Sequence, residues 1–79
     1  MNDRELLYVK MIVESKSISE AAKKLFIAQP SLSQALQKIE ENIGTQLFIR
    51  NHDGMKLTLA GEKYYLTATE ILKDRKSVV

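Results

Sequence analysis

The sequence predicts a mainly α-helical domain with one β-hairpin, and three observations predict it. Apolar residues recur at helical spacing in four segments of the chain. Between the third and fourth segments, Asp53-Gly54 separates two short apolar runs, which is a strong hairpin signal. The chain has 79 residues, of which 44% are hydrophobic and 28% charged, so it is too apolar to be disordered and too short for two cores.

The residue composition argues against an enzyme and against a metal site. The chain contains no cysteine and one histidine, which excludes disulfides and thiolate metal ligands. No apolar run approaches the ~20 residues that a membrane helix needs, and the start of the chain does not resemble a signal peptide. We therefore expect a cytoplasmic protein that catalyses no reaction and uses no cofactor and no metal. His52 is expected to be a turn residue, because no second ligand lies near it in the sequence.

The first segment predicts a helix that starts after Asn2, its expected N-cap, and ends at residues 15–17. Leu6, Val9 and Val13 share one face of this helix. A second apolar stripe lies on another side, and a helix that is apolar on two sides usually lies between two neighbours.

The second helix is short, and its N-cap is either Ser17 or Ser19, which the sequence leaves open. Its inward face consists of Ala21, Ala22 and Leu25. The two alanines are small enough for another helix to approach closely.

The third helix starts at Gln29-Pro30, because proline at the first helical position loses no hydrogen bond. Gly44 is the expected left-handed cap at its C-terminus. The inward face repeats at i, i+4, i+7 and i+11, through Leu32, Leu36, Ile39 and Ile43. The opposite face is polar.

Residues 47–50 and 55–58 predict the two strands of the hairpin, which must pack against the helices because two strands alone are marginally stable. The last helix starts near Thr58, its expected N-cap. Its main apolar face contains Gly61, Tyr65, Ala68 and Leu72, widened by Ala60, Tyr64 and Ile71, while Leu59 and Leu66 form a separate stripe. The two adjacent tyrosines are expected to be packing residues.

Residues 18–37 fit the helix-turn-helix pattern, in which the second helix presents a polar face outward. Ala22 stands where the first helix of this motif needs a small residue. Phe26 stands where the generic motif favours glycine in the turn. A left-handed phenylalanine is strained by roughly 1–2 kcal/mol, so we expect a longer turn that avoids this conformation.

The polar face of the third helix is suited to the major groove of DNA, which admits one α-helix. The candidates for hydrogen bonds to base edges are Gln29, Ser33, Gln34 and Gln37. Pro30 offers an apolar contact for a thymine methyl group, while Ser31 and Lys38 are placed for phosphates. Arg50 would contact a phosphate or form a salt bridge within the hairpin, and we favour the phosphate. The net charge of +2 requires such a surface to be a local concentration of basic residues.

Two other interpretations of this face stay open. A helix face rich in serine and glutamine is most often merely solvated. A helix-turn-helix can also serve as a protein–protein assembly module without DNA binding, which would show little salt-dependent affinity for duplexes.

At these residues the chain resembles a known family. The run AAKKLFIAQPSLSQALQKIEENIGTQLFIR, followed by KLTLAGE, is similar to the N-terminal DNA-binding domain of LysR-type transcriptional regulators, and the resemblance covers roughly Leu6 to Leu72. It implies a winged helix-turn-helix of three helices and a two-stranded wing in residues 1–58, followed by a linker helix in residues 59–79. It also implies transcription regulation by a dimer that binds double-stranded DNA at operators with inverted-repeat half-sites. In the family a C-terminal domain binds a small effector, and we expect these 79 residues to lack that domain.

The resemblance also implies roles for individual residues. Residues 30–43 would be the recognition helix in the major groove, with the family's base-reading positions at Gln29, Pro30, Ser33 and Gln34. The residues on or near the DNA backbone would be Ser31, Lys38 and Arg50. Residues 50–56 would be the wing, with His52 and Lys56 approaching the minor groove.

Two residues depart from the family pattern. Gln34 stands where many members have arginine, which favours contact with adenine over guanine. Asp53 stands where the wing often carries basic residues, so His52 and Lys56 are weaker substitutes there.

Apolar surface remains uncovered in this predicted domain. The first helix has a second stripe at Leu7 and Met11, and the last helix carries more apolar residues than one small core needs. We expect a symmetric homodimer with an isologous interface, formed mainly through the last helix. The expected contacts are Tyr65, Leu66, Ile71 and Leu72.

Overall fold

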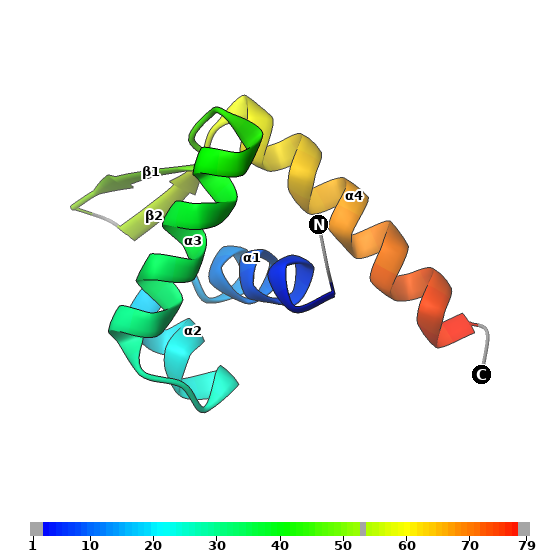
Figure 1. The fold of residues 1–79 in the computed structure, drawn as a ribbon, viewed down its shortest axis with the longest axis horizontal. Helices are drawn as coiled ribbons and strands as arrows, with labels where there is room; N and C mark the ends of the chain where they lie inside the picture. Colours follow the sequence, from blue (N-terminus) through cyan, green and yellow to red (C-terminus); the bar gives the residue numbers. More distant parts are fainter. Residues whose placement is uncertain (1–2, 53, 78–79) are drawn as a thin grey trace.

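The structure, a computed structural model, describes residues 3–52 and 54–77 of the chain. The elements are helices α1 (Asp3–Ser15), α2 (Ile18–Leu25) and α3 (Gln29–Ile43), strands β1 (Phe48–Asn51) and β2 (Gly54–Leu57), and helix α4 (Leu59–Ser77). Helix α1 lies in the middle, between α3 and α4, and contacts α2 and β2 as well (Figure 1). The prediction that the first helix lies between neighbours is confirmed.

The core forms around one face of α1. Leu6, Val9 and Ile12 are buried there, while Val13 is only half-buried. Val13 still packs against the core with Leu6 and Val9, the face that the sequence predicted, but the fully buried Ile12 was not among the residues singled out from the sequence. Neighbours on both sides of α1 decide which of two adjacent apolar stripes is enclosed, and the periodicity of a single helix does not contain that information. The predicted N-cap, Asn2, lies outside the described residues.

The cap of α2 is Ser17, which decides between the two serines that the sequence left open. Its Oγ accepts a hydrogen bond from the Glu20 backbone N–H at 3.3 Å. Ala21 and Ala22 are buried against the neighbouring helices, as predicted.

The turn after α2 is tight, and the prediction of a longer turn is wrong. Phe26 adopts the left-handed conformation, with φ 60° and ψ 40°. The backbone N–H of Phe26 bonds to the Lys23 carbonyl at 3.2 Å, and that of Ile27 bonds to the Ala22 carbonyl at 3.1 Å. This pair of bonds is the Schellman motif, which satisfies the last carbonyls of the helix. Together with the packing of Ile27 against the core, these bonds offset the strain of Phe26, whose side chain is 94% exposed.

Helix α3 starts at Gln29, so Ala28 is the N-cap and Pro30 is the second helical residue rather than the first. Gly44 ends the helix with φ 88°, and its N–H bonds to the Glu40 carbonyl at 2.8 Å, which confirms the predicted cap. The inward residues Leu32, Leu36 and Ile39 are buried. Ile43 was predicted to join them but is exposed, because at the last turn of α3 its side chain lines an open hollow.

The hairpin is antiparallel, with Phe48 opposite Leu57 and Asn51 opposite Gly54, which confirms the hairpin predicted from Asp53-Gly54. Its strands are displaced by one residue from the predicted ranges, since Leu47 and Thr58 lie outside them. The Met55 N–H bonds to the Lys16 carbonyl at 3.2 Å. A Cβ on Gly54, whose φ is 120°, would lie 2.8 Å from that same carbonyl oxygen, so glycine permits the close approach.

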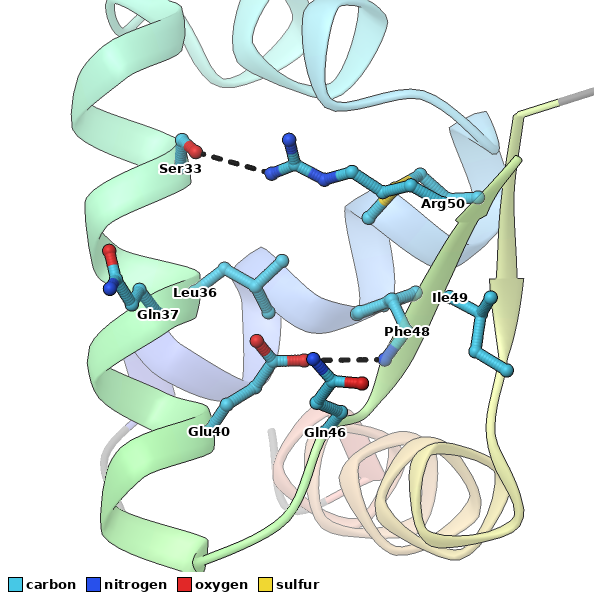
Figure 2. Close-up of a pocket in the computed structure, with 9 residues that line it drawn as sticks. Ser33, Leu36, Gln37, Glu40, Gln46, Phe48, Ile49 and Arg50 are labelled. Atoms are coloured by element: carbon cyan, nitrogen blue, oxygen red, sulfur yellow. Dashed lines mark hydrogen bonds between the residues drawn. The ribbon is translucent and has the colours of Figure 1, made fainter. Parts of the chain in front are cut away.

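The side chain of Glu40 joins α3 to the start of β1. One carboxylate oxygen, Oε2, accepts hydrogen bonds from the backbone N–H groups of Leu47, at 2.7 Å, and Phe48, at 3.3 Å. Figure 2 shows Glu40 reaching from α3 toward β1. The hairpin is thus fixed to α3 on one side and to the α1–α2 junction on the other.

Helix α4 starts after Thr58, and the predicted cap is confirmed. The Thr58 Oγ1 accepts a bond from the Gly61 N–H at 3.0 Å and donates to the Gln46 carbonyl at 2.6 Å. The buried residues of α4 include Tyr64 and Ala68. Within the described residues, no helix combines the length and the apolar character needed to cross a membrane.

Replacing Glu40 with alanine should destabilise the fold by about 1–3 kcal/mol, because two part-buried N–H groups lose their acceptor. Urea denaturation at neutral pH would measure this loss. The matched control is Glu41→Ala on the same helix, which is exposed and should change stability by less than about 0.5 kcal/mol. Equal effects of the two substitutions would contradict the anchoring role of Glu40.

Candidate nucleic-acid interface

The outer face of α3 carries the polar residues that the sequence singled out. With Leu32, Leu36 and Ile39 turned into the core, the opposite side of the helix is left to solvent. The exposed residues on it are Gln29, Pro30, Ser31, Gln34, Gln37 and Lys38. Ser33 differs from them, because it is half-buried. The helix therefore offers glutamine amides and one lysine on a single accessible face.

Arg50 reaches from β1 to α3. Its Nη2 donates a hydrogen bond to the Ser33 Oγ at 3.4 Å, across the space between the two elements (Figure 2). The two ion pairs found in the part of the chain that the structure describes are Lys10–Glu14 and Lys23–Glu20, and neither involves Arg50. The hydroxyl partner leaves the guanidinium its full positive charge.

A hollow of about 380 Å³ separates α3 from β1. Figure 2 shows Ser33, Gln37 and Glu40 on the helix side, with Phe48 and Arg50 on the strand side. At one end of this hollow, the carboxylate of Glu40 accepts hydrogen bonds from two backbone N–H groups. Arg50 at the other end carries the opposite charge beside the start of the exposed helix face.

The hairpin adds further polar and basic side chains. His52 and Lys56 are exposed, while Asp53 lies outside the described residues. A second hollow, of about 260 Å³, lies where the start of α2, α3 and the hairpin meet, and Lys16 and Arg50 both line it. Lys16 is a basic residue of this surface that the sequence did not indicate. It follows α1, far from the hairpin in the sequence, and lies beside the hairpin through contacts that include the hydrogen bond from Met55.

The opposite side of the molecule carries the residues predicted for dimerisation. Leu66 is 64% exposed, whereas Tyr65, Ile71 and Leu72 are half-buried. The Tyr65 hydroxyl donates to Glu14 Oε2 at 3.4 Å, and Ile71 and Leu72 pack against the core. Leu59, which the sequence placed in one stripe with Leu66, is 70% exposed.

Tyr64 belongs to the core and not to a surface for stacking bases, as predicted. Its hydroxyl is buried and has no hydrogen-bond partner within residues 3–52 and 54–77. Burial, with a smaller contribution from the charge of Glu5, raises the pKa of Tyr64 to about 12. The side chain is therefore neutral at physiological pH. Among the described residues, no group of three His, Cys, Asp or Glu side chains is arranged to hold a metal ion.

The family described as "Bacterial regulatory helix-turn-helix protein, lysR family" matches residues 4–62 of the chain. The HTH-type transcriptional regulator BenM of Acinetobacter baylyi (strain ATCC 33305 / BD413 / ADP1) is 39% identical over 79 residues, which are 100% of this chain and 26% of that protein. The HTH-type transcriptional regulator BudR of Raoultella terrigena is 43% identical over 72 residues, which are 91% of this chain and 25% of that protein. The chain thus spans about a quarter of the length of these relatives.

The fold is similar to that in a crystal structure of the BenM DBD in complex with catB site 1 DNA. The TM-score is 0.93 at 38% sequence identity, and the match covers 99% of this chain and 88% of that chain. This likeness confirms the predicted fold class, a winged helix-turn-helix followed by a helix, in which the β1–β2 hairpin is the wing. The chain belongs to the LysR family of bacterial regulatory helix-turn-helix proteins.

Proposed function

We propose that this chain binds double-stranded DNA sequence-specifically and regulates transcription, with α3 as the recognition helix. The observation that carries the proposal is the exposed polar face of α3, flanked by the guanidinium of Arg50, whose partner among the described residues is the neutral hydroxyl of Ser33. The names of BenM and BudR as transcriptional regulators support it, as does the BenM complex with DNA. The protein would act in the cytoplasm, where bacterial DNA lies, and would catalyse no reaction and need no cofactor.

The proposed contacts divide between bases and backbone. Gln29, Gln34 and Gln37 would meet base edges in the major groove, and Pro30 a thymine methyl group. Ser31, Lys38 and Arg50 would contact phosphates, which position the protein without specifying a sequence. His52 and Lys56 in the wing would approach the minor groove. In this proposal residues 1–58 bind DNA and residues 59–79 form the linker helix. Neither of these two parts would bind an effector.

The competing function is a winged-helix module for protein–protein assembly. The placement of basic residues favours DNA, because Lys16, which follows α1, and Arg50 on β1 line the same hollow as Gln29 at the start of α3. Lys38 on α3 and Lys56 on β2 are exposed as well. Selection of bound duplexes from a random pool tests the two functions. DNA binding predicts enrichment of one inverted-repeat site, while an assembly module predicts no enrichment and little binding at low salt.

Replacing Lys38 or Arg50 with alanine should weaken binding to the selected duplex and to a scrambled duplex alike. If each residue contacts one phosphate, the slope of log K against log salt should fall by about 0.9 in each variant. Titrations at several salt concentrations would measure it. Lys63→Ala is the control, since Lys63 is exposed on α4, away from this surface. A slope unchanged in both variants would assign these charges a structural role.

Replacing Gln29 with alanine should cost about 1–3 kcal/mol on the selected duplex and little on scrambled DNA, because a base contact is lost. Gln34→Arg should move the preference toward guanine at one position in each half-site. Thermal melting serves as the control, since both side chains are exposed and stability should barely change. If both variants kept the sequence preference of the parent chain, α3 would not be the element that recognises the bases, and the wing would be the next candidate.

We also propose that the chain forms a symmetric homodimer through α4, with Leu66 at its centre and Tyr65, Ile71 and Leu72 beside it. Leu59 and Leu66 leave large apolar side chains in water, which a partner helix would cover. Sedimentation at high micromolar concentration should show a dimer, and Leu66→Glu should shift it to monomer. Lys24→Glu, which places the same side chain at an exposed position of α2, away from α4, should leave it a dimer. A parent chain that sediments as a monomer would contradict this interface.

A further inference from the structure

We propose that Ser33 is a positioning residue for Arg50 rather than a reader of bases, and this inference rests on the proposed DNA binding. Ser33 is the one half-buried residue among the polar side chains singled out on α3. Its hydroxyl points across the hollow toward β1 and accepts the hydrogen bond from Arg50 at 3.4 Å (Figure 2). A hydroxyl aimed at the wing is turned away from the groove that Gln29 and Gln34 would enter.

The backbone of Arg50 is already fixed before its side chain is considered. Arg50 pairs with Met55 across the hairpin, and the Met55 N–H is bound to the Lys16 carbonyl. Two residues before Arg50, the Phe48 N–H is bound to Glu40 of α3. The Ser33 hydroxyl then holds the far end of the side chain. Arg50 is thereby restrained at both ends, between α3 and the wing.

Such restraint favours binding of a phosphate. A free arginine side chain has about 2 kcal/mol of rotamer entropy, part of which is lost when it binds a fixed partner. A side chain that is ordered beforehand loses less. The guanidinium has five N–H donors, and the bond to Ser33 uses one of them. Because serine is neutral, it orders Arg50 without cancelling the charge that attracts a phosphate, which a carboxylate at position 33 would do.

A double-mutant cycle separates this role from base reading. The variants are Ser33→Ala, Arg50→Ala and the double variant, each titrated with the selected duplex and with a scrambled duplex. We expect Ser33→Ala to weaken binding to both duplexes roughly threefold to tenfold, and to have no further effect when Arg50 is already alanine. Ser33→Thr keeps the hydroxyl and should restore most of the affinity.

The outcomes that overturn the inference are equally definite. A loss confined to the selected duplex, or one that adds fully to that of Arg50→Ala, would make Ser33 an independent base contact. No loss in Ser33→Ala would make the hydrogen bond incidental. Failure of the proposed function itself is recognised separately, because the parent chain would then bind neither duplex.

A measurement without DNA tests directly whether the Ser33 hydroxyl orders the Arg50 side chain. In the free protein, ¹⁵N relaxation of the Arg50 Nε–Hε group should show greater mobility in Ser33→Ala than in the parent and in Ser33→Thr. A merely structural role of Ser33 would change the thermal midpoint and leave this mobility as it is in the parent. Equal mobility in all three proteins would overturn the positioning role.

Discussion

The carboxylate of Glu40 is the contact on which the arrangement of the surface depends. It accepts hydrogen bonds from the N–H groups of Leu47 and Phe48 and so connects the last turn of α3 to the first residue of the wing. Leu47 is fully buried, and its carbonyl accepts the Thr58 N–H at 3.0 Å just before α4 begins. Gly61 lies directly against that carbonyl, where a Cβ would not fit. One short segment therefore joins α3, the wing and α4.

This junction explains how so small a domain presents a rigid two-part surface. Two strands alone are marginal, and here the hairpin gains hydrogen bonds from both α3 and the α1–α2 junction. The wing is thereby held at a fixed distance from α3, with Arg50 spanning the gap. A net charge of only +2 is compatible with such a surface, because the fold brings Lys16 and Arg50, from distant parts of the chain, to one hollow beside the start of α3.

Local chemistry made much of the fold predictable from sequence. Some signals act on residues close to them in the sequence: the predicted caps Thr58 and Gly44, and the Asp53-Gly54 pair that predicted a turn. The helix ends and the hairpin predicted from them are confirmed. The turn at Phe26 was misjudged because the prediction counted the strain of a left-handed phenylalanine alone. It left out the hydrogen bonds to Ala22 and Lys23, and the packing of Ile27 against the core, which depends on distant parts of the chain.

The missed features of the site are contacts between distant parts of the chain. From the sequence alone, Glu40 cannot be told apart from an ordinary solvent-exposed carboxylate on a helix, because its partners lie seven and eight residues away, beyond the helix end. The hydrogen bond between Ser33 and Arg50, 17 residues on, likewise cannot be seen from the helical periodicity that placed Ser33 on the polar face of α3. Sequence periodicity assigns a residue to a face of its own helix, and it does not say which other element covers that face.

If α3 and the wing form one DNA-binding surface, both should respond together when DNA binds. Amide ¹H–¹⁵N spectra of the labelled chain, recorded while the selected duplex is added, measure this response. We expect the amides of residues 29–38 and of the β1–β2 hairpin to shift together, while those of the buried α1 residues Leu6 and Val9 shift little. Shifts confined to α4 around Leu59 and Leu66, with α3 and the hairpin unchanged, would contradict it.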